Sequence, residues 1–282
     1  MSIEELLKKS IVILRENEIE DASLKAKMLL MHILKVSKQY LIINKDLNID
    51  DNKKNEFEIG IKKLCEHIPI QYIINSQEFF GYIFLVNNNV LIPQPDTEVL
   101  VEEVINIISN NYKFNNRKIK LLDLCTGSGA IGISLAKEIN NLEVYLSDIS
   151  EKALEIAKKN AEFNKADVKI IKSDLFKNID EKKFDFIVSN PPYIETDIIK
   201  ELSEEVKKEP KLALDGGLDG LDFYKRISEE AKYYLNEGGY LVLEIGYNQR
   251  EAVIDILTKD NYKNIYCKKD LGFNDRVIVA QI

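Results

Sequence analysis

The chain has 282 residues, of which 45% are hydrophobic and 30% are charged, and its formal net charge is −8 at pH 7. These values exclude a disordered, collagen-like or membrane-embedded protein, and they argue against direct nucleic-acid binding, which draws its affinity from lysine and arginine. Three widely separated cysteines and two histidines supply no pattern of metal ligands, so no metal is expected. Glu4 and Glu5 stand where a signal peptide carries bases, so we expect a cytoplasmic protein with no membrane partner.

Apolar side chains recur at helical spacing over residues 2–66, which predicts three or four short helices. The first helix opens with Ser2 and has Glu5 three residues later, the arrangement of a capping box that satisfies free N–H groups at a helix start. We expect residues 1–75 to form a small helical domain.

The helical spacing of apolar residues ends before residues 78–92, where aromatic and β-branched residues surround Gly81 and an asparagine turn at 87–89. This pattern predicts a β-hairpin. We expect residues 76–95 to link the helical domain to the rest of the chain.

Two prolines, Pro93 and Pro95, precede an amphipathic pattern that runs from Asp96 to about Ile108. This pattern predicts a helix with acids in its first turn, where the helix dipole favours negative charge. The asparagine-rich residues 110–116 predict a polar loop after it.

From Lys118 onward, short β-branched runs alternate with helical patterns. This alternation predicts an α/β fold over residues 96–282, in which a mostly parallel sheet is covered by helices on both faces. The expected strands cover 119–124, 142–147, 168–172, 184–189, 239–245, 261–267 and 275–281, and the expected helices cover 128–139, 150–164, 220–235 and 248–258.

A glycine-containing turn follows the first strand of the sheet. Its residues are Cys125, Thr126, Gly127, Ser128 and Gly129. Glycine lets the backbone turn tightly and approach a ligand, while the N–H groups of the next helix point at it. The turn matches neither the Walker P-loop nor the complete dinucleotide fingerprint, so a tight turn without a ligand stays an open alternative.

Carboxylates mark the ends of the next two strands. Asp148 follows the second strand, where a carboxylate can reach both hydroxyls of a ribose, and Asp174 ends the third, where it can accept from an adenine amino group. Either acid alone could equally be a solvated loop residue. Together with the glycine turn, the two acids indicate an adenosine pocket, and they favour a methyl-donor nucleoside because no residue reaches for a pyrophosphate.

The sequence Asn190-Pro191-Pro192-Tyr193 follows the strand at 184–189 and is the most specific signal in the chain. Prolines supply no N–H, so the main chain offers carbonyl acceptors, and Asn190 is held extended by the proline after it. A planar –NH2 group could donate one proton to the Asn190 side-chain oxygen and the other to the Pro191 carbonyl, while Tyr193 stacks on its face. These acceptors would help a delocalised nitrogen to attack an electrophile.

With these residues the sequence resembles the release-factor glutamine N5-methyltransferases, Class I S-adenosylmethionine enzymes that methylate the glutamine of the Gly-Gly-Gln motif in class I peptide chain release factors. The resemblance runs from about residue 20 to the C-terminus. It also includes Pro69 to Ile73, Leu91 to Glu98, Glu209-Pro210, Leu214 to Leu221, Asp270 and Arg276-Val277.

The resemblance implies a seven-stranded Rossmann-like sheet with an antiparallel final hairpin, preceded by a helical domain, residues 1–75, that helps to dock the release factor. It also implies which residues form the site. Those near the methyl donor, S-adenosyl-L-methionine, would be Cys125, Thr126, Gly127, Ser128, Gly129, Asp148, Asp174, Leu175 and Asn190, and those that hold the substrate glutamine would be Asn190, Pro191, Pro192 and Tyr193.

Three residues depart from the family's pattern. Gln94 stands where many members have arginine, Leu175 where an aromatic ring often packs on adenine, and Cys125 where many have the first glycine. A lost stacking ring would weaken donor binding by about 1 kcal/mol. A cysteine is tolerable at this turn if its backbone angle is ordinary and its thiol points into the core.

Other functions fit parts of the same pattern. Glutamine methylation of a ribosomal protein is chemically identical, and adenine-N6 methylation of DNA also places a planar amino group in such a loop. The DNA reaction needs a basic, aromatic surface for a flipped base, which the N-terminal residues lack. A catalytically silent donor-binding scaffold is the remaining alternative, supported only by Cys125 and Leu175.

Overall fold

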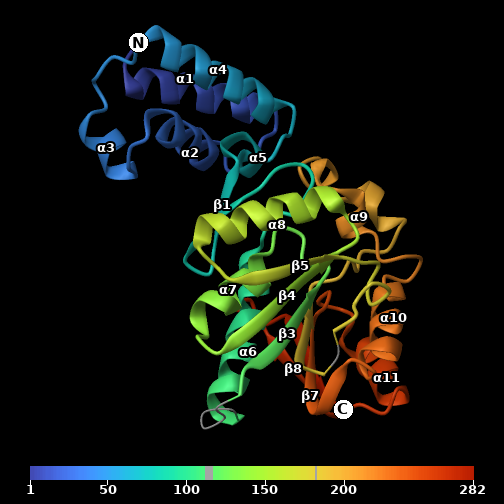
Figure 1. The fold of residues 1–282 in the computed structure, drawn as a ribbon. Helices are drawn as coiled ribbons and strands as arrows, with labels where there is room; N and C mark the ends of the chain where they lie inside the picture. Colours follow the sequence, from blue (N-terminus) through green and yellow to red (C-terminus); the bar gives the residue numbers. More distant parts are fainter. Residues whose placement is uncertain (112–116, 182) are drawn as a thin grey trace. The chain divides into compact units, whose positions relative to one another are not determined.

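The computed structural model describes residues 1–111, 117–181 and 183–282 (Figure 1). It divides into two compact units, one of Met1–Ser76 with Ser203–Lys208, the other of Gln77–Leu202 with Glu209–Ile282. No helix among the described residues is long and apolar enough to cross a membrane. Residues 112–116 of the expected polar loop lie outside the described residues, whereas 110 and 111 belong to a helix.

The first unit is helical, as expected, and the predicted capping box is present: the Ser2 Oγ accepts from the Glu5 N–H at 3.2 Å, and the Glu5 carboxylate accepts from the Ser2 N–H at 3.0 Å. The three or four helices predicted over residues 2–66 are confirmed, since four lie there, and a fifth, of only five residues, follows them. The helices are α1 (Ile3–Glu16), α2 (Ala22–Leu34), α3 (Lys38–Ile43), α4 (Asp51–Cys65) and α5 (Ile70–Ile74). The Ser203–Lys208 segment joins this unit through an ion pair between Glu205 and Lys25 of α2.

The hairpin is shorter than predicted. Its strands are β1 (Ser76–Phe79) and β2 (Tyr82–Leu85), and the chain reverses at Phe80 and Gly81. The prediction that it extends to Ile92 is wrong, because the Asn87 side chain accepts from the Asn89 N–H at 2.9 Å and closes a separate turn. The assignment of residues 76–95 as a linker, and of 1–75 as a docking domain, stays a prediction.

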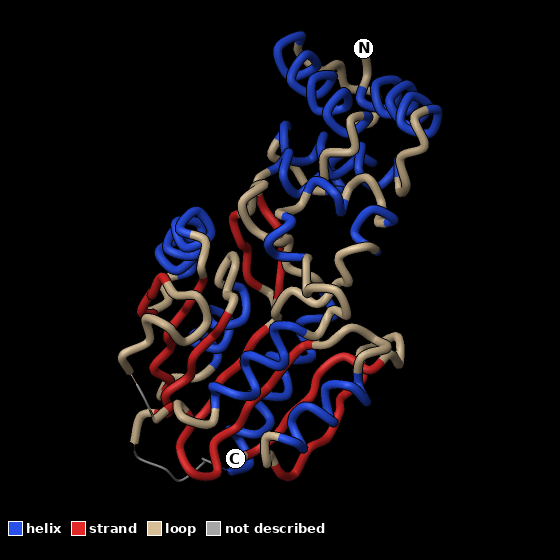
Figure 2. The backbone as a smooth tube through the Cα atoms, turned by 90° about the vertical axis from the view of Figure 1, so that its right-hand side faces the viewer, coloured by secondary structure: helices blue, strands red, loops and turns tan. Residues whose placement is uncertain are grey.

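The second unit contains a seven-stranded sheet in the order β5-β4-β3-β6-β7-β9-β8, which confirms the predicted α/β class (Figures 1 and 2). Strands β3 to β7 are parallel, and β9 pairs antiparallel with both β7 and β8. The strands are β3 (Ile119–Leu124), β4 (Leu142–Asp148), β5 (Val168–Lys172), β6 (Phe184–Ser189), β7 (Leu235–Glu244), β8 (Lys263–Lys269) and β9 (Asp275–Gln281).

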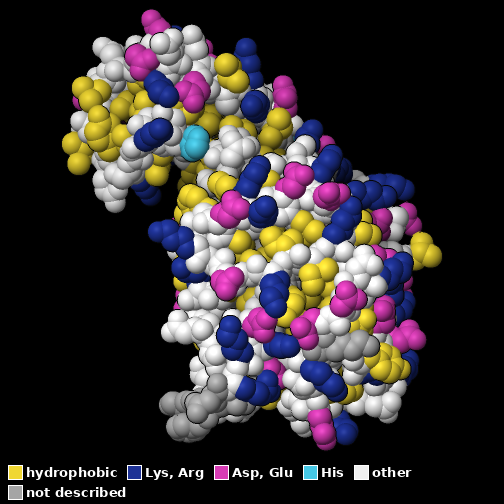
Figure 3. Space-filling model, in the orientation of Figure 1, with side chains coloured by type: hydrophobic (Ala, Val, Ile, Leu, Met, Phe, Trp, Pro, Cys, Tyr) yellow, Lys and Arg dark blue, Asp and Glu magenta, His cyan; other side chains and the backbone are white. Residues whose placement is uncertain are grey.

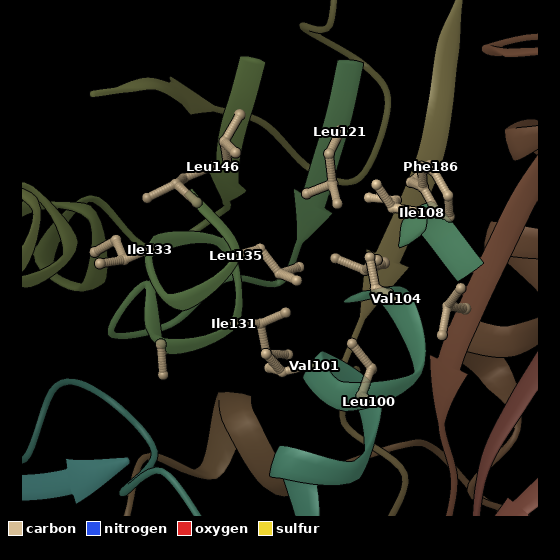
Figure 4. Close-up of a cluster of buried hydrophobic side chains, with 14 of the residues drawn as sticks. Leu100, Val101, Val104, Ile108, Leu121, Ile131, Ile133, Leu135, Leu146 and Phe186 are labelled. Carbon is tan, nitrogen blue, oxygen red and sulfur yellow. The ribbon is translucent and has the colours of Figure 1, made fainter. Parts of the chain in front are cut away.

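Helices cover both faces of this sheet, because alternate residues of its strands feed two separate apolar clusters. One face packs against α6 (Glu98–Asn111), α7 (Ala130–Glu138) and α8 (Glu151–Asn164), and Figure 4 shows side chains of α6 and α7 meeting those of Leu121, Leu146 and Phe186. The other face packs against α10 (Asp222–Ala231) and α11 (Arg250–Lys259). The short segments are η1 (Pro95–Thr97), η2 (Ile198–Glu201), η3 (Val206–Lys208) and α9 (Lys211–Leu214).

Several predicted boundaries shift by a few residues. The helix expected over 128–139 begins at Ala130, and the one expected over 220–235 is α10, which ends at Ala231 because β7 already begins at Leu235. The helix expected from Asp96 starts as η1 and becomes α6 at Glu98. These shifts leave the order of elements unchanged.

Candidate functional site

The predicted site residues gather at the carboxyl edge of the sheet. The strand order reverses between the neighbouring strands β3 and β6. The glycine turn follows β3, and the Asn190 loop follows β6. In open α/β sheets a ligand binds at such a switch point, because loops leave the two strands in opposite directions and open a crevice between them.

A cavity of about 350 Å³ lies at this edge, within the range of about 300–1,000 Å³ that is typical of small-molecule sites. Its lining combines seven of the predicted residues with others from neighbouring loops. The lining residues are Asn89, Val90, Leu91, Cys125, Gly127, Ser147, Asp148, Ile149, Ser150, Ala153, Ser173, Asp174, Leu175, Asn190, Pro192, Pro210, Leu212, Ala213, Phe223 and Arg226.

The glycine turn is shaped by a buried carboxylate beneath it. The Asp123 Oδ2 accepts from the Thr126 hydroxyl at 2.6 Å and from the Gly132 N–H at 3.0 Å, and burial raises the pKa of Asp123 to about 7. Ser128 is buried, and its carbonyl accepts from the Asn160 side chain at 2.8 Å. Thr126 and Ser128 therefore hold the turn in place from behind the cavity surface.

Cys125 does not meet the condition of an ordinary backbone angle. Its φ is +56°, in the left-handed region, as are Gly127 at +54° and Gly129 at +84°. A side chain in this region costs about 1–2 kcal/mol, because its Cβ crowds the following carbonyl. This strain explains physically why glycine would be the easier residue at position 125.

We expect the Cys125→Gly variant to be more stable than Cys125→Ala by about 1 kcal/mol, because both lose the sulfur contacts while only glycine relieves the backbone strain. The free energy of unfolding, measured with urea for both variants, tests this directly. An alanine variant as stable as the glycine variant would show that the turn is not strained.

Asp148 faces the cavity with both oxygens already oriented by the backbone. Its Oδ2 accepts from the Gly127 N–H at 2.9 Å and its Oδ1 from the Ser150 N–H at 2.8 Å. Burial raises the pKa of Asp148, although these N–H groups favour its charged form. Each carboxylate oxygen keeps acceptor capacity, so the group can still receive hydroxyl donors from a ligand.

The segment after β5 differs from expectation in detail. The strand ends at Lys172, two residues before Asp174, and the Asp174 carboxylate accepts from Lys177 and from Arg226, each at 2.7 Å. These cations lower the pKa of Asp174. The acid lines the cavity but is already paired, so a ligand amino group would have to share it with them.

Asn190 leaves β6 half-buried at the cavity surface, and its orientation is fixed by a neighbour. The side-chain Nδ2 donates to the Thr97 Oγ1 at 3.3 Å, which leaves the Asn190 Oδ1 as an acceptor. Pro191 and Pro192 are buried. The Tyr193 hydroxyl donates to the Glu244 Oε1 at 3.4 Å.

Two residues that sequence reasoning had not assigned to the site support this loop. A Cβ on Gly216 would lie 2.6 Å from the Tyr193 Cα, so the two backbones touch there. The Gln249 Nε2 donates to the Tyr193 carbonyl at 3.0 Å. Gly216 belongs to a glycine-rich stretch visible in the sequence, whereas no local pattern marks Gln249.

Phe223 and Arg226 of α10 also line the cavity, and the Arg226 guanidinium lies 5.9 Å from the Phe223 ring centroid. Leu175 is buried with a φ of +49°. Phe223 thus supplies an aromatic side chain to a cavity in which position 175, often aromatic in the family, is a leucine. The spacing of Phe223 within an amphipathic helix does not indicate this role.

The chemistry of the lining fits a nucleoside with a charged tail, such as S-adenosylmethionine. A Cβ on Gly127 would meet nothing within 4 Å, so the turn leaves open space beside its backbone. The acceptors Asp148 and Asp174 lie next to the apolar side chains of Ile149 and Leu175. Carboxylates can accept from the hydroxyl and amino groups of a nucleoside, and apolar side chains can contact its planar base.

Comparison with known proteins agrees with this geometry. A family model described as "Methyltransferase small domain" matches residues 97–217, and one described as "PrmC N-terminal domain" matches residues 5–74. The release factor glutamine methyltransferase of Clostridium acetobutylicum is 42% identical over 286 residues, covering 99% of this chain and 98% of the relative. That of Clostridium botulinum is 39% identical over 287 residues, covering 100% and 99%.

Among solved structures, the Thermus thermophilus 16S rRNA N2 G1207 methyltransferase, determined with AdoMet and guanosine, matches with a TM-score of 0.51 at 19% identity, covering 73% of this chain and 49% of that one. At this identity the likeness concerns the fold alone.

Proposed function

Because this chain belongs to the family of release factor glutamine methyltransferases, we propose that it transfers a methyl group from S-adenosyl-L-methionine to the glutamine side-chain nitrogen of the Gly-Gly-Gln motif in class I peptide chain release factors. The orientation of Asn190 is the observation that carries the proposal. Its side chain lines the cavity and its nitrogen is bound to Thr97, so its oxygen would accept from the substrate nitrogen as that nitrogen loses its planarity.

The donor would lie between the glycine turn and the acids. Asp148 would hold the ribose hydroxyls, Asp174 and Leu175 would border the base, and the open side of the turn at Gly127 would admit the methionine moiety. When bound, S-adenosylmethionine supplies an electrophilic methyl carbon on a positively charged sulfur. The chain itself supplies orientation and excludes water, because Pro192, Leu175 and Phe223 cover the cavity with apolar surface.

The acceptor glutamine would be held by the loop after β6. The Asn190 Oδ1 and the Pro191 carbonyl would each accept one proton of its –NH2 group, while Tyr193 would border the amide plane. Two acceptors favour the pyramidal nitrogen, on which positive charge develops, over the planar ground state. No strong base is needed for the methyl transfer, because the methylated nitrogen is acidic enough to release its proton to water.

The remaining expectations belong to the same proposal: a cytoplasmic enzyme whose helical residues 1–75 dock the release factor and which binds no nucleic acid directly. Figure 3 supports the last point for the face it shows, where Lys and Arg side chains are interspersed with Asp and Glu rather than gathered in a stripe. Adenine methylation of DNA would call for such a basic stripe beside the cavity.

Transfer of a labelled methyl group tests the proposal. The methyl acceptors are purified release factor and the same factor with alanine in place of its Gly-Gly-Gln glutamine. Two further acceptors test the alternatives: the unmethylated form of a ribosomal protein that is a substrate for glutamine methylation, and duplex DNA. We expect label on the intact factor alone. Label on DNA or on the ribosomal protein would replace the proposed substrate, and donor binding without label on any acceptor would indicate a scaffold.

Replacing Asp148 with alanine should weaken donor binding by about 10- to 100-fold, because charge-assisted hydrogen bonds contribute about 1.5–3 kcal/mol. Calorimetric titration with S-adenosylmethionine measures the Kd. Asp167→Ala, which removes an exposed carboxylate next to β5, is the matched control and should bind as the parent does. An unchanged Kd in Asp148→Ala would remove this residue from the donor site.

A further inference from the structure

Two buried polar side chains lie beneath the Asn190 loop and are not explained by ligand contact. Thr97, at the end of η1, is 4% exposed, and Glu244, at the end of β7, is 2% exposed. Neither lines the cavity described above. Polar groups buried this deeply are costly unless hydrogen bonding compensates them, so their surroundings are informative.

Thr97 belongs to a run of three polar residues that each bind a different part of the second unit. The Asp96 Oδ2 lies 3.2 Å from the Arg276 Nη2, and the Glu98 Oε1 accepts from the Phe80 N–H at 2.8 Å. Thr97 accepts from Asn190 at 3.3 Å. The outer two residues anchor the segment at β9 and at the hairpin, and thereby fix the Thr97 hydroxyl under Asn190.

A hydroxyl has one proton to donate, and the Asn190 contact uses the oxygen of Thr97 as an acceptor. The proton of Thr97 is therefore available to Glu244, and hydrogen bonding by Thr97 lowers the pKa of that carboxyl group. An ionised carboxylate can only accept. If Thr97 donates its proton to an ionised Glu244, its oxygen can only accept from Asn190, as it does from the Asn190 Nδ2 at 3.3 Å, and the Asn190 Oδ1 is then turned away from Thr97.

The surroundings of Glu244 place its titration near neutral pH. Burial raises its pKa to about 7, Arg276 and the Tyr193 hydroxyl favour its charged form, and Asp96 opposes it. The Tyr224 hydroxyl donates to the backbone carbonyl of Glu244 at 2.9 Å, and Asp270 holds Arg276 at 3.0 Å. Among the described residues the Glu244 Oε2 has no hydrogen-bond partner.

We propose that Thr97 and Glu244 are positioning residues, which fix the amide of Asn190 so that its oxygen faces the nitrogen to be methylated. The reaction they serve rests on the proposed function, whereas the hydrogen-bonded chain does not. If Glu244 were protonated, it would donate its proton to the Thr97 oxygen in competition with the Asn190 Nδ2. Asn190 could then turn its –NH2 group toward the substrate, where it would repel the –NH2 group of the glutamine instead of accepting from it.

Variants at Thr97 test the chain by kinetics. Thr97→Val keeps the shape and removes the hydroxyl, and we expect kcat for release factor to fall on the order of 10- to 100-fold, as a misoriented catalytic group predicts. The Kd for S-adenosylmethionine should not change. Thr97→Ser should restore most of the rate, and Thr258→Val, the same change at an exposed helical position, should be neutral.

The pH profile gives a second kinetic readout. Because ionised Glu244 is the orienting form, kcat of the parent should rise as pH increases through about 7. This rise should be absent in Glu244→Gln and in Thr97→Val. A Thr97→Val enzyme with the parent's kcat, or a Glu244→Gln enzyme that keeps the parent's rise, would overturn the proposal.

Hydrogen exchange of the Asn190 side-chain amide, followed by NMR, does not depend on turnover. Exchange should be slow in the parent and in Thr97→Ser, and faster in Thr97→Val. If the parent enzyme labels no release factor, the proposed function fails, and this readout alone then decides the inference: unchanged exchange in Thr97→Val would overturn the hydrogen-bonded chain, and faster exchange would support it.

Discussion

Replacing Asn190 with alanine should lower kcat for release factor methylation on the order of 10²- to 10³-fold, the loss that follows removal of one preorganised polar group from an acyl-transfer site. Asn190 lines the cavity, and its nitrogen donates to Thr97 at 3.3 Å, which leaves its oxygen as the acceptor proposed to orient the substrate. Alanine removes that acceptor at the point where the reacting nitrogen gains positive charge. Donor binding should change little, because the proposed ribose contacts are those of Asp148, on another strand.

Steady-state kinetics at saturating donor, together with a calorimetric Kd for S-adenosylmethionine, separate the two effects. Asn52→Ala, on an exposed position of α4, is the matched control and should keep the parent's kcat. If Asn190→Ala kept most of its rate, the orienting role of this amide would be wrong. If it lost donor affinity and rate in equal measure, Asn190 would serve binding rather than the transfer step.

Replacing Gly216 with alanine should have the second-largest effect, because the new Cβ has no space. It would lie 2.6 Å from the Tyr193 Cα, 2.8 Å from the Tyr193 carbonyl carbon and 2.9 Å from the Pro192 oxygen, all of them backbone atoms. The loop that is proposed to hold the substrate must then move. We expect kcat to fall on the order of 10²-fold and the free energy of unfolding to fall by about 1–3 kcal/mol.

Gly238→Ala separates this steric effect from ordinary glycine strain. Gly238 has a φ of +71° but meets nothing within 4 Å of an added Cβ, and it lies in β7 away from the cavity. This control should lose some stability and keep its kcat. Equal kcat values for Gly216→Ala and Gly238→Ala would contradict the claim that Gly216 sets the position of the loop.

The sequence predicted the order of the strands and helices along the chain well, because each central strand is a short, mainly apolar run that is buried on both faces. The runs ending at Leu124 and Ser189 show this most clearly, and both are followed directly by the residues proposed to bind. A residue at the end of a parallel strand necessarily reaches the carboxyl edge of the sheet. The sequence alone was therefore enough to predict that the glycine turn, Asp148 and the Asn190 loop lie at the same edge of the sheet.

Features that depend on distant partners escaped prediction. Nothing near Cys125 in the sequence shows that its φ is positive, and the extent of the hairpin depended on whether the Asn87 side chain would close a turn of its own. The hydrogen bond of Asn190 with Thr97 joins two segments far apart in the chain, and the proposed role of Glu244 adds a third. Periodicity reports which face of an element is apolar, but it carries no information on which buried polar groups meet.

The most direct test of the central claim is the chemical position of the transferred methyl group. Tandem mass spectrometry of release factor treated with the parent enzyme should place one methyl group on the side-chain nitrogen of the Gly-Gly-Gln glutamine, and factor treated with Asn190→Ala under the same conditions should carry far less. A methyl group on any other residue, or equal modification by both enzymes, would contradict the account.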